Sequence, residues 1–201
     1  MILAGPKFKL FNFVGAPVRL SLLFFFLLPM VGFDIPVFVS VFVAILVHEM
    51  AHAFVSHRKG YTVYGIDIDL FAGAAALDAN MHQRDSMHVS LAGPLSNLFL
   101  AGLAMVLIPY FPHMGTFLGV NVFLFVFNIL PIYPMDGGMA FRDFLMLRMR
   151  DRRRAVEVAA ITSLVFCVFG FIAALFGGFF VMAIFFAIFF YQTLKSAGYV
   201  K

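Results

Sequence analysis

Long apolar stretches follow one another along nearly the whole chain, and they restrict its fold more than any other feature. Hydrophobic residues make up 63% of the 201 residues and charged residues 12%, whereas a soluble domain is about half apolar and about a quarter charged. A lipid bilayer can absorb this excess of apolar surface, and a soluble core cannot. Because a spanning helix needs about 20 residues, the sequence predicts an all-α polytopic membrane protein with about six transmembrane helices. The apolar stretches lie at about 18–33, 36–57, 86–108, 116–130, 155–176 and 179–195.

Two other segments have the composition of β-strands. Residues 7–14 partly alternate polar and apolar side chains, which favours a short strand. Residues 62–79 are rich first in β-branched and aromatic residues and then in small ones, which favours a β-hairpin. No internal repeat or linker is visible, so we expect one integral-membrane domain over residues 1–201 with a small membrane-associated β element on the cytoplasmic side.

The positive charges test this layout independently. With six spans and a cytoplasmic N-terminus, every lysine and arginine falls on the cytoplasmic side, as the positive-inside rule requires. The opposite loops, near Asp34, His113 and Gly177, carry no lysine or arginine. We therefore expect both termini in the cytoplasm, and we read the net charge of +4 as a property of these loops and not as a sign of nucleic-acid binding. The short length favours a prokaryotic plasma membrane.

The second apolar stretch contains the sequence HEMAH from His48 to His52. On a helix, residues four apart differ by about 40° around the axis and about 6 Å along it. Two imidazoles placed in this way can bind one zinc ion, with Glu49 beside it to take a proton from water. Ionisable side chains in a membrane helix are expensive to bury and usually mark a functional site. The alternative is a buried hydrogen-bonded cluster or a proton relay.

A hydrolytic zinc site needs a third protein ligand and an open position for water. The fourth stretch ends in NILPIYPMDG, from Asn128 to Gly137, and its prolines cannot continue a helix. The order of the spans places this turn at the cytoplasmic end, near the depth of His52, so Asp136 can point back into the bundle. Two neutral imidazoles and one carboxylate with zinc also leave little net charge in a low-dielectric interior. The alternative is an aspartate that only caps a loop.

Three motifs in this order resemble the site-2 protease family of intramembrane zinc proteases. They are HEMAH, AGPLSN from Ala92 to Asn97, and NILPIYPMDG. The similarity covers about residues 8–145. Accessory PDZ and CBS domains are not visible in the sequence, so the resemblance is to a minimal form of the family.

This resemblance implies a role for each motif. Glu49 would be the general base, and Asn97 and Asn128 would steady the substrate or the developing oxyanion. The ligands of one Zn²⁺ per chain would be His48, His52 and Asp136.

The predicted hairpin bears on how a membrane helix could be cut. A helical peptide bond is hydrogen-bonded within its own helix, so the substrate must unwind locally. An exposed sheet edge can then bind the unwound strand by main-chain pairing. Gly73 and its alanine neighbours leave room for this approach, and we expect Gly73 to bind substrate. A hairpin that only covers the cytoplasmic face is the alternative.

The predicted function is therefore that of an intramembrane zinc endopeptidase acting on transmembrane or membrane-proximal segments of membrane-anchored proteins. Its partners would be the substrate helix and the lipid bilayer. Two other classes remain open. A membrane zinc protease with a glutamate as third ligand would have only Glu157 available after the HEMAH motif. A transporter would usually show an internal repeat.

Overall fold

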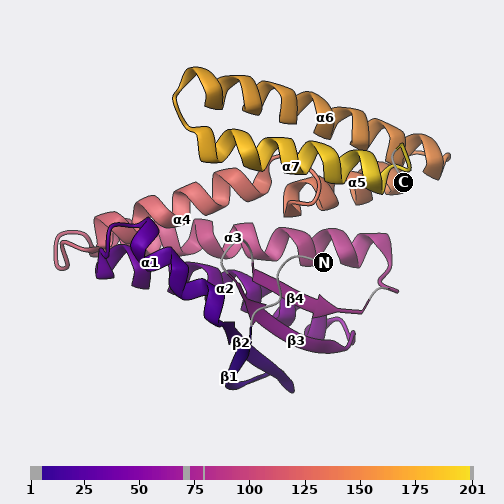
Figure 1. Ribbon diagram of the computed structural model, residues 1–201. Helices are drawn as coiled ribbons and strands as arrows, with labels where there is room; N and C mark the ends of the chain where they lie inside the picture. The colour runs from indigo at the N-terminus through magenta and orange to yellow at the C-terminus, as the bar shows by residue number, and fades with distance from the viewer. Residues whose placement is uncertain (1–5, 70–72, 79, 200–201) are drawn as a thin grey trace. The chain divides into compact units, whose positions relative to one another are not determined.

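The computed structural model describes residues 6–69, 73–78 and 80–199. The chain divides into two compact units, one of Met1–Met81 with Ala92–Phe127 and one of His82–Leu91 with Asn128–Lys201. In chain order the elements are β1 (Lys7–Phe13), β2 (Ala16–Ser21), the 3-10 helix η1 (Leu22–Phe26), α1 (Leu27–Met30), α2 (Ile35–Arg58), β3 (Val63–Ile68), β4 (Gly73–Leu77), α3 (Gln83–Leu107), α4 (Met114–Ile129), α5 (Asp136–Arg148), α6 (Arg152–Phe176) and α7 (Phe180–Ser196) (Figure 1).

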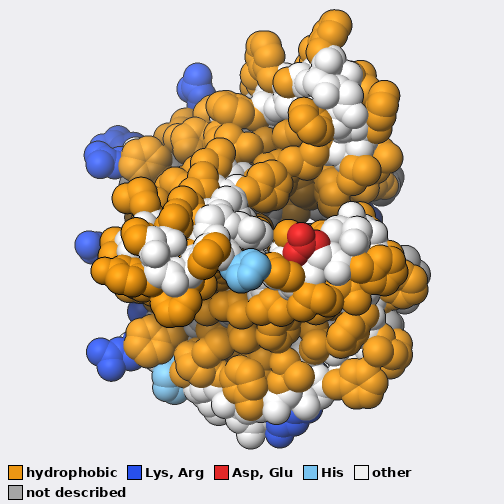
Figure 2. All heavy atoms as spheres, turned by 90° about the vertical axis from the view of Figure 1, so that its left-hand side faces the viewer, with side chains coloured by type: hydrophobic (Ala, Val, Ile, Leu, Met, Phe, Trp, Pro, Cys, Tyr) orange, Lys and Arg blue, Asp and Glu red, His pale blue; other side chains and the backbone are white. Residues whose placement is uncertain are grey.

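Within the described residues, the three helices α2, α3 and α6 are long and apolar enough to cross a membrane, and α4 and α7 are apolar but shorter. Many large hydrophobic side chains on these helices are exposed, such as Phe99 at 71% and Phe176 at 91%. Hydrophobic side chains also cover most of the face drawn in Figure 2. Because water disfavours so large an apolar surface, the prediction of a mostly helical membrane protein with a small β element is confirmed.

The prediction of one helix over residues 18–33 is wrong. This stretch divides among β2, η1 and α1, and α1 has only four residues. Ser21 begins the helical part by accepting the Leu23 N–H at 3.2 Å, and Gly32, with a φ of +65°, follows its end. The apolar run misleads because hydropathy alone does not separate a short strand from a helix, and here the run joins the strand β2 to η1 and α1.

The β element is a four-stranded sheet in the order β1-β2-β3-β4. Strand β2 pairs antiparallel with β1 and parallel with β3, and β3 pairs antiparallel with β4. Val18, Leu20, Ile66 and Ile68 are buried in one core with Phe24 and with Ala53 of α2. This packing lays the sheet along α2 and brings its last strand, β4, into contact with that helix.

In the second unit, α6 and α7 lie side by side and α5 packs on α6 (Figure 1). Two buried hydroxyls bind the segment that leads from α4 to α5. The Oγ of Ser163 accepts the N–H of Tyr133 at 2.9 Å, and it is 2.9 Å from the Oγ1 of Thr193. Thr193 also donates to the carbonyl of Tyr133 at 3.3 Å, so the turn before Asp136 is attached to both α6 and α7.

Candidate metal centre

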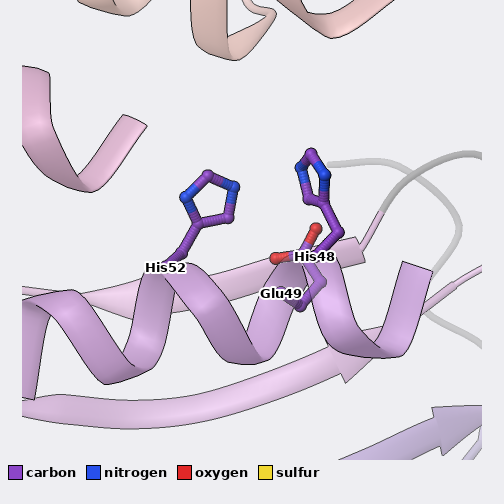
Figure 3. A group of neighbouring side chains, drawn as sticks. All are labelled: His48, Glu49 and His52. Atoms are coloured by element: carbon purple, nitrogen blue, oxygen red, sulfur yellow. The ribbon is translucent and has the colours of Figure 1, made fainter. Parts of the chain in front are cut away.

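One turn of α2 carries three side chains that could hold a metal ion. His48, Glu49 and His52 each offer a ligand atom, and these atoms all lie within 4.8 Å of one another. Each residue is only 6% exposed. The two imidazoles project from the same side of α2, and the Glu49 carboxylate lies beside them (Figure 3). The structure thus brings together the three residues of the HEMAH motif, as a spacing of four on a helix requires.

Gly93 of α3 lies against both imidazoles. A Cβ at this position would collide with the Nε2 of His52 and the Nε2 of His48. The glycine therefore lets the two imidazoles approach α3 more closely than a larger residue would allow. Two imidazole nitrogens and a carboxylate are also donors that zinc accepts. By the chemistry and the closeness of these donors, the residues present fit zinc.

Asn97, one helical turn after Gly93, contacts His48 directly. Its Oδ1 lies 2.5 Å from the Nδ1 of His48. Its Nδ2 donates to the carbonyl of Ala44 at 3.3 Å and to the Oδ1 of Asn121 at 2.9 Å. The predicted site residue is therefore in the site, but both of its amide hydrogens already have acceptors within the protein.

Sequence reasoning missed Asn121 of α4, which is fully buried. The signal that could have found it is one that it shares with Asn97. Each is an amide inside an apolar stretch, where it must find a polar partner.

Strand β4 reaches the site through its main chain. The N–H of Ala75 donates to the Oε2 of Glu49 at 3.0 Å. Because β4 is the last strand of the sheet, this N–H points away from β3 and toward α2. Gly73 is the first residue of the same strand. Groups two residues apart on a strand face the same edge, so the main chain of Gly73 shares the edge that contacts Glu49.

Asp136 and Asn128 belong to the other compact unit, and their roles stay predictions. Asp136 is the first residue of α5 and is 9% exposed. Gly137 and Gly138 follow it, and a Cβ on either would collide with the main chain of the preceding turn. Close packing therefore fixes where α5 begins. Asn128 lies near the end of α4.

Comparison with known proteins finds that the chain is similar in sequence to zinc metalloproteases. The zinc metalloprotease MJ0392 of Methanocaldococcus jannaschii is 26% identical over 182 residues, which are 81% of this chain and 53% of that protein. Rip3 of Mycobacterium tuberculosis, provisionally named a zinc metalloprotease, is 34% identical over 128 residues, which are 58% of this chain and 33% of that protein. The chain thus spans about half the length of the first relative and a third of the second. No protein-family model matches the chain.

A solved structure shares the fold. It is the site-2 protease from Methanocaldococcus jannaschii, with a TM-score of 0.71 and 21% identity, and the match covers 98% of this chain and 97% of that one. The resemblance inferred from the three motifs is confirmed by these relatives together with this fold.

Alanine at position 93 is expected to impair metal binding, because its Cβ would collide with both Nε2 atoms and displace the two imidazoles. Wild-type protein purified in detergent with zinc should hold about one ion per chain, and Gly93→Ala should hold far less by elemental analysis. Gly102→Ala is the matched control, since it lies on the same helix and nothing stands within 4 Å of its added Cβ. Equal zinc in the two variants would contradict this interpretation.

Proposed function

We propose that the chain is a member of the site-2 protease family of zinc metalloproteases and that it is an intramembrane zinc endopeptidase, in keeping with its relatives and its fold. It cleaves transmembrane or membrane-proximal segments of membrane-anchored proteins. The observation that carries the proposal is the buried group of His48, Glu49 and His52 on α2, a helix long and apolar enough to cross a membrane. A hydrolytic donor set at this place is within reach of a substrate that is itself in the bilayer.

Glu49 performs the proton transfers of the reaction. When bound, zinc polarises the scissile carbonyl and makes water more acidic. Glu49 takes a proton from the attacking water as its oxygen bonds to the carbonyl carbon. It then delivers that proton to the amide nitrogen as the C–N bond breaks. The Ala75 N–H holds one carboxylate oxygen of Glu49 and so orients the group for both transfers.

Asp136 is the third ligand in this proposal. Its carboxylate is buried at the first turn of α5, and a carboxylate oxygen is a donor that zinc accepts. The preceding turn is attached to α6 through Ser163. Because this turn is already fixed, little conformational entropy is lost when Asp136 binds the ion. The stoichiometry is one zinc ion per chain.

In this proposal the chain crosses the membrane six times, and both termini are cytoplasmic. The first passage is composite, because β2 and η1 share a core with α2 and α1 also contacts α2. The loops that carry lysine and arginine then lie on the cytoplasmic side of a prokaryotic plasma membrane.

The free edge of β4 is the proposed binding site for the unwound substrate. The main chain of Gly73 lies on that edge, two residues from the Ala75 N–H that contacts Glu49. A substrate strand added there would pass next to the base. Asn128, at the end of α4, is the proposed second contact that steadies the substrate.

Replacing Glu49 with glutamine should abolish cleavage while zinc stays bound. The amide keeps the size of the side chain but cannot take a proton, and such a base contributes about 10²- to 10⁴-fold to the rate. Cleavage of a model transmembrane substrate in detergent and zinc content should be measured together, with wild type as reference. An active Glu49→Gln protein would exclude Glu49 as the base, and a wild type without zinc or cleavage would refute the proposed function.

Replacing Asp136 with asparagine should reduce bound zinc, because a neutral amide is a much weaker ligand than a carboxylate. Elemental analysis should find clearly less than the about one ion per chain expected for wild type. Asp151→Asn is the control, since Asp151 is an exposed helix cap and asparagine caps helices equally well. Full zinc in the Asp136→Asn protein would remove Asp136 from the ligand set.

Replacing Gly73 with valine should slow cleavage without loss of zinc, because the branched side chain crowds the edge that the substrate approaches. Tyr64→Val changes an exposed residue of the neighbouring strand and should leave the rate near that of wild type. Steady-state cleavage and zinc content of both variants test the difference. Equal loss of zinc and activity in Gly73→Val would show that the residue supports the fold and does not bind substrate.

A further inference from the structure

Two buried asparagines on different helices form a chain of hydrogen bonds that ends on His48. Asn121 of α4 and Asn97 of α3 are both 0% exposed. The Oδ1 of Asn121 accepts from the Nδ2 of Asn97 at 2.9 Å, and the Oδ1 of Asn97 lies 2.5 Å from the Nδ1 of His48. Buried amides need partners, and here the last partner is a candidate metal ligand.

Two main-chain carbonyls give this chain its direction. A carbonyl oxygen can only accept a hydrogen bond. The carbonyl of Phe117 lies 2.9 Å from one amide end of Asn121, which must therefore be Nδ2, so Oδ1 faces Asn97. The carbonyl of Ala44 likewise faces the Nδ2 of Asn97 at 3.3 Å, so Oδ1 faces His48. The orientation of both amides, which is usually ambiguous, follows from fixed acceptors in the backbone.

The direction of the chain decides which nitrogen of His48 carries hydrogen. Because the Oδ1 of Asn97 only accepts, the Nδ1 of His48 must donate. A neutral imidazole has a single N–H, so its Nε2 keeps a lone pair. That Nε2 packs against Gly93, as does the Nε2 of His52.

We propose that Asn97 and Asn121 are positioning residues that hold His48 in the tautomer and ring orientation required to bind zinc through Nε2. A histidine ligand usually donates its other N–H to a fixed acceptor, and loss of that acceptor weakens metal binding about 10- to 100-fold. An amide performs this role without adding a charge to the low-dielectric interior. The inference rests on the proposed zinc site, and it gives Asn97 a role that needs no contact with the substrate.

Zinc affinity of a variant series tests the proposal. The apparent Kd is measured in detergent by competition with a chelator of known affinity. Asn97→Leu removes the acceptor and should bind zinc about 10- to 100-fold more weakly, and Asn121→Leu, which loosens Asn97, should show a smaller loss. Asn97→Asp keeps an oxygen opposite Nδ1 and should stay near wild type, although it loses the bonds to Ala44 and Asn121. Thr162→Ala, which removes a helix hydroxyl bonded to its own helix, controls for loss of a polar group in a span.

The tautomer itself is read in zinc-free protein by long-range proton–nitrogen correlation of ¹⁵N-histidine, with His48 assigned from a His48→Gln sample. The Nδ1–H form is expected in wild type and Asn97→Asp, and the Nε2–H form in Asn97→Leu. An Nε2–H form in wild type, or unchanged zinc affinity in Asn97→Leu, would overturn the proposal. An Nδ1–H form in a wild-type protein that binds no zinc would refute the metal site but leave the hydrogen-bond chain in place.

Discussion

Polar groups buried among apolar helices must find their partners inside the protein, and the arrangement around α2 follows from this constraint. Three ionisable side chains lie on one turn of a helix that can span a membrane, where no water replaces a missing hydrogen bond. The partners come from elements far apart in the sequence. Strand β4 contributes the N–H of Ala75 to Glu49, and α3 contributes the amide of Asn97 to His48. The core of Val18, Phe24 and Ile66 packs the sheet against α2, and β4 pairs with β3 and contacts the same helix, so this apolar packing also supports the polar site.

The features that could be predicted from the sequence are those that depend on local geometry. The grouping of His48, Glu49 and His52 needs only the pitch of one helix, and the strand near residues 7–13 needs only local alternation. The first apolar stretch failed because its structure depends on distant partners. Residues 16–21 become a strand by pairing with β1 on one side and with β3, in parallel, on the other. No pattern within the stretch carries that information, and hydropathy alone describes an apolar strand and an apolar helix in the same way.

Asn97 and Asn121 show a second limit on what can be predicted from the sequence. Asn97 was predicted from the resemblance of its motif, and the position of both amides in apolar stretches is a further sign that each has a polar partner. What each amide does depends on which acceptors surround it, and those are the main-chain carbonyls of Ala44 and Phe117. The sequence therefore indicates that a buried amide has a purpose, whereas only the packing of α2, α3 and α4 distinguishes an oxyanion donor from an acceptor that orients a histidine. In this packing both hydrogens of the Asn97 amide are donated within the protein. This favours Asn97 as the acceptor that orients His48.

The contact between Ala75 and Glu49 also limits how a substrate can pair with β4. The N–H of Ala75 faces the free edge of the sheet, but it is already donated to the carboxylate of Glu49. Under the proposed function, a substrate strand would therefore have to use the main-chain groups on either side, at Gly73 and Leu77, which face the same edge. Such pairing would set the register of the substrate relative to the base. The scissile bond would then be selected by where the substrate can unwind and pair, and less by its side chains, since main-chain hydrogen bonds are common to all sequences.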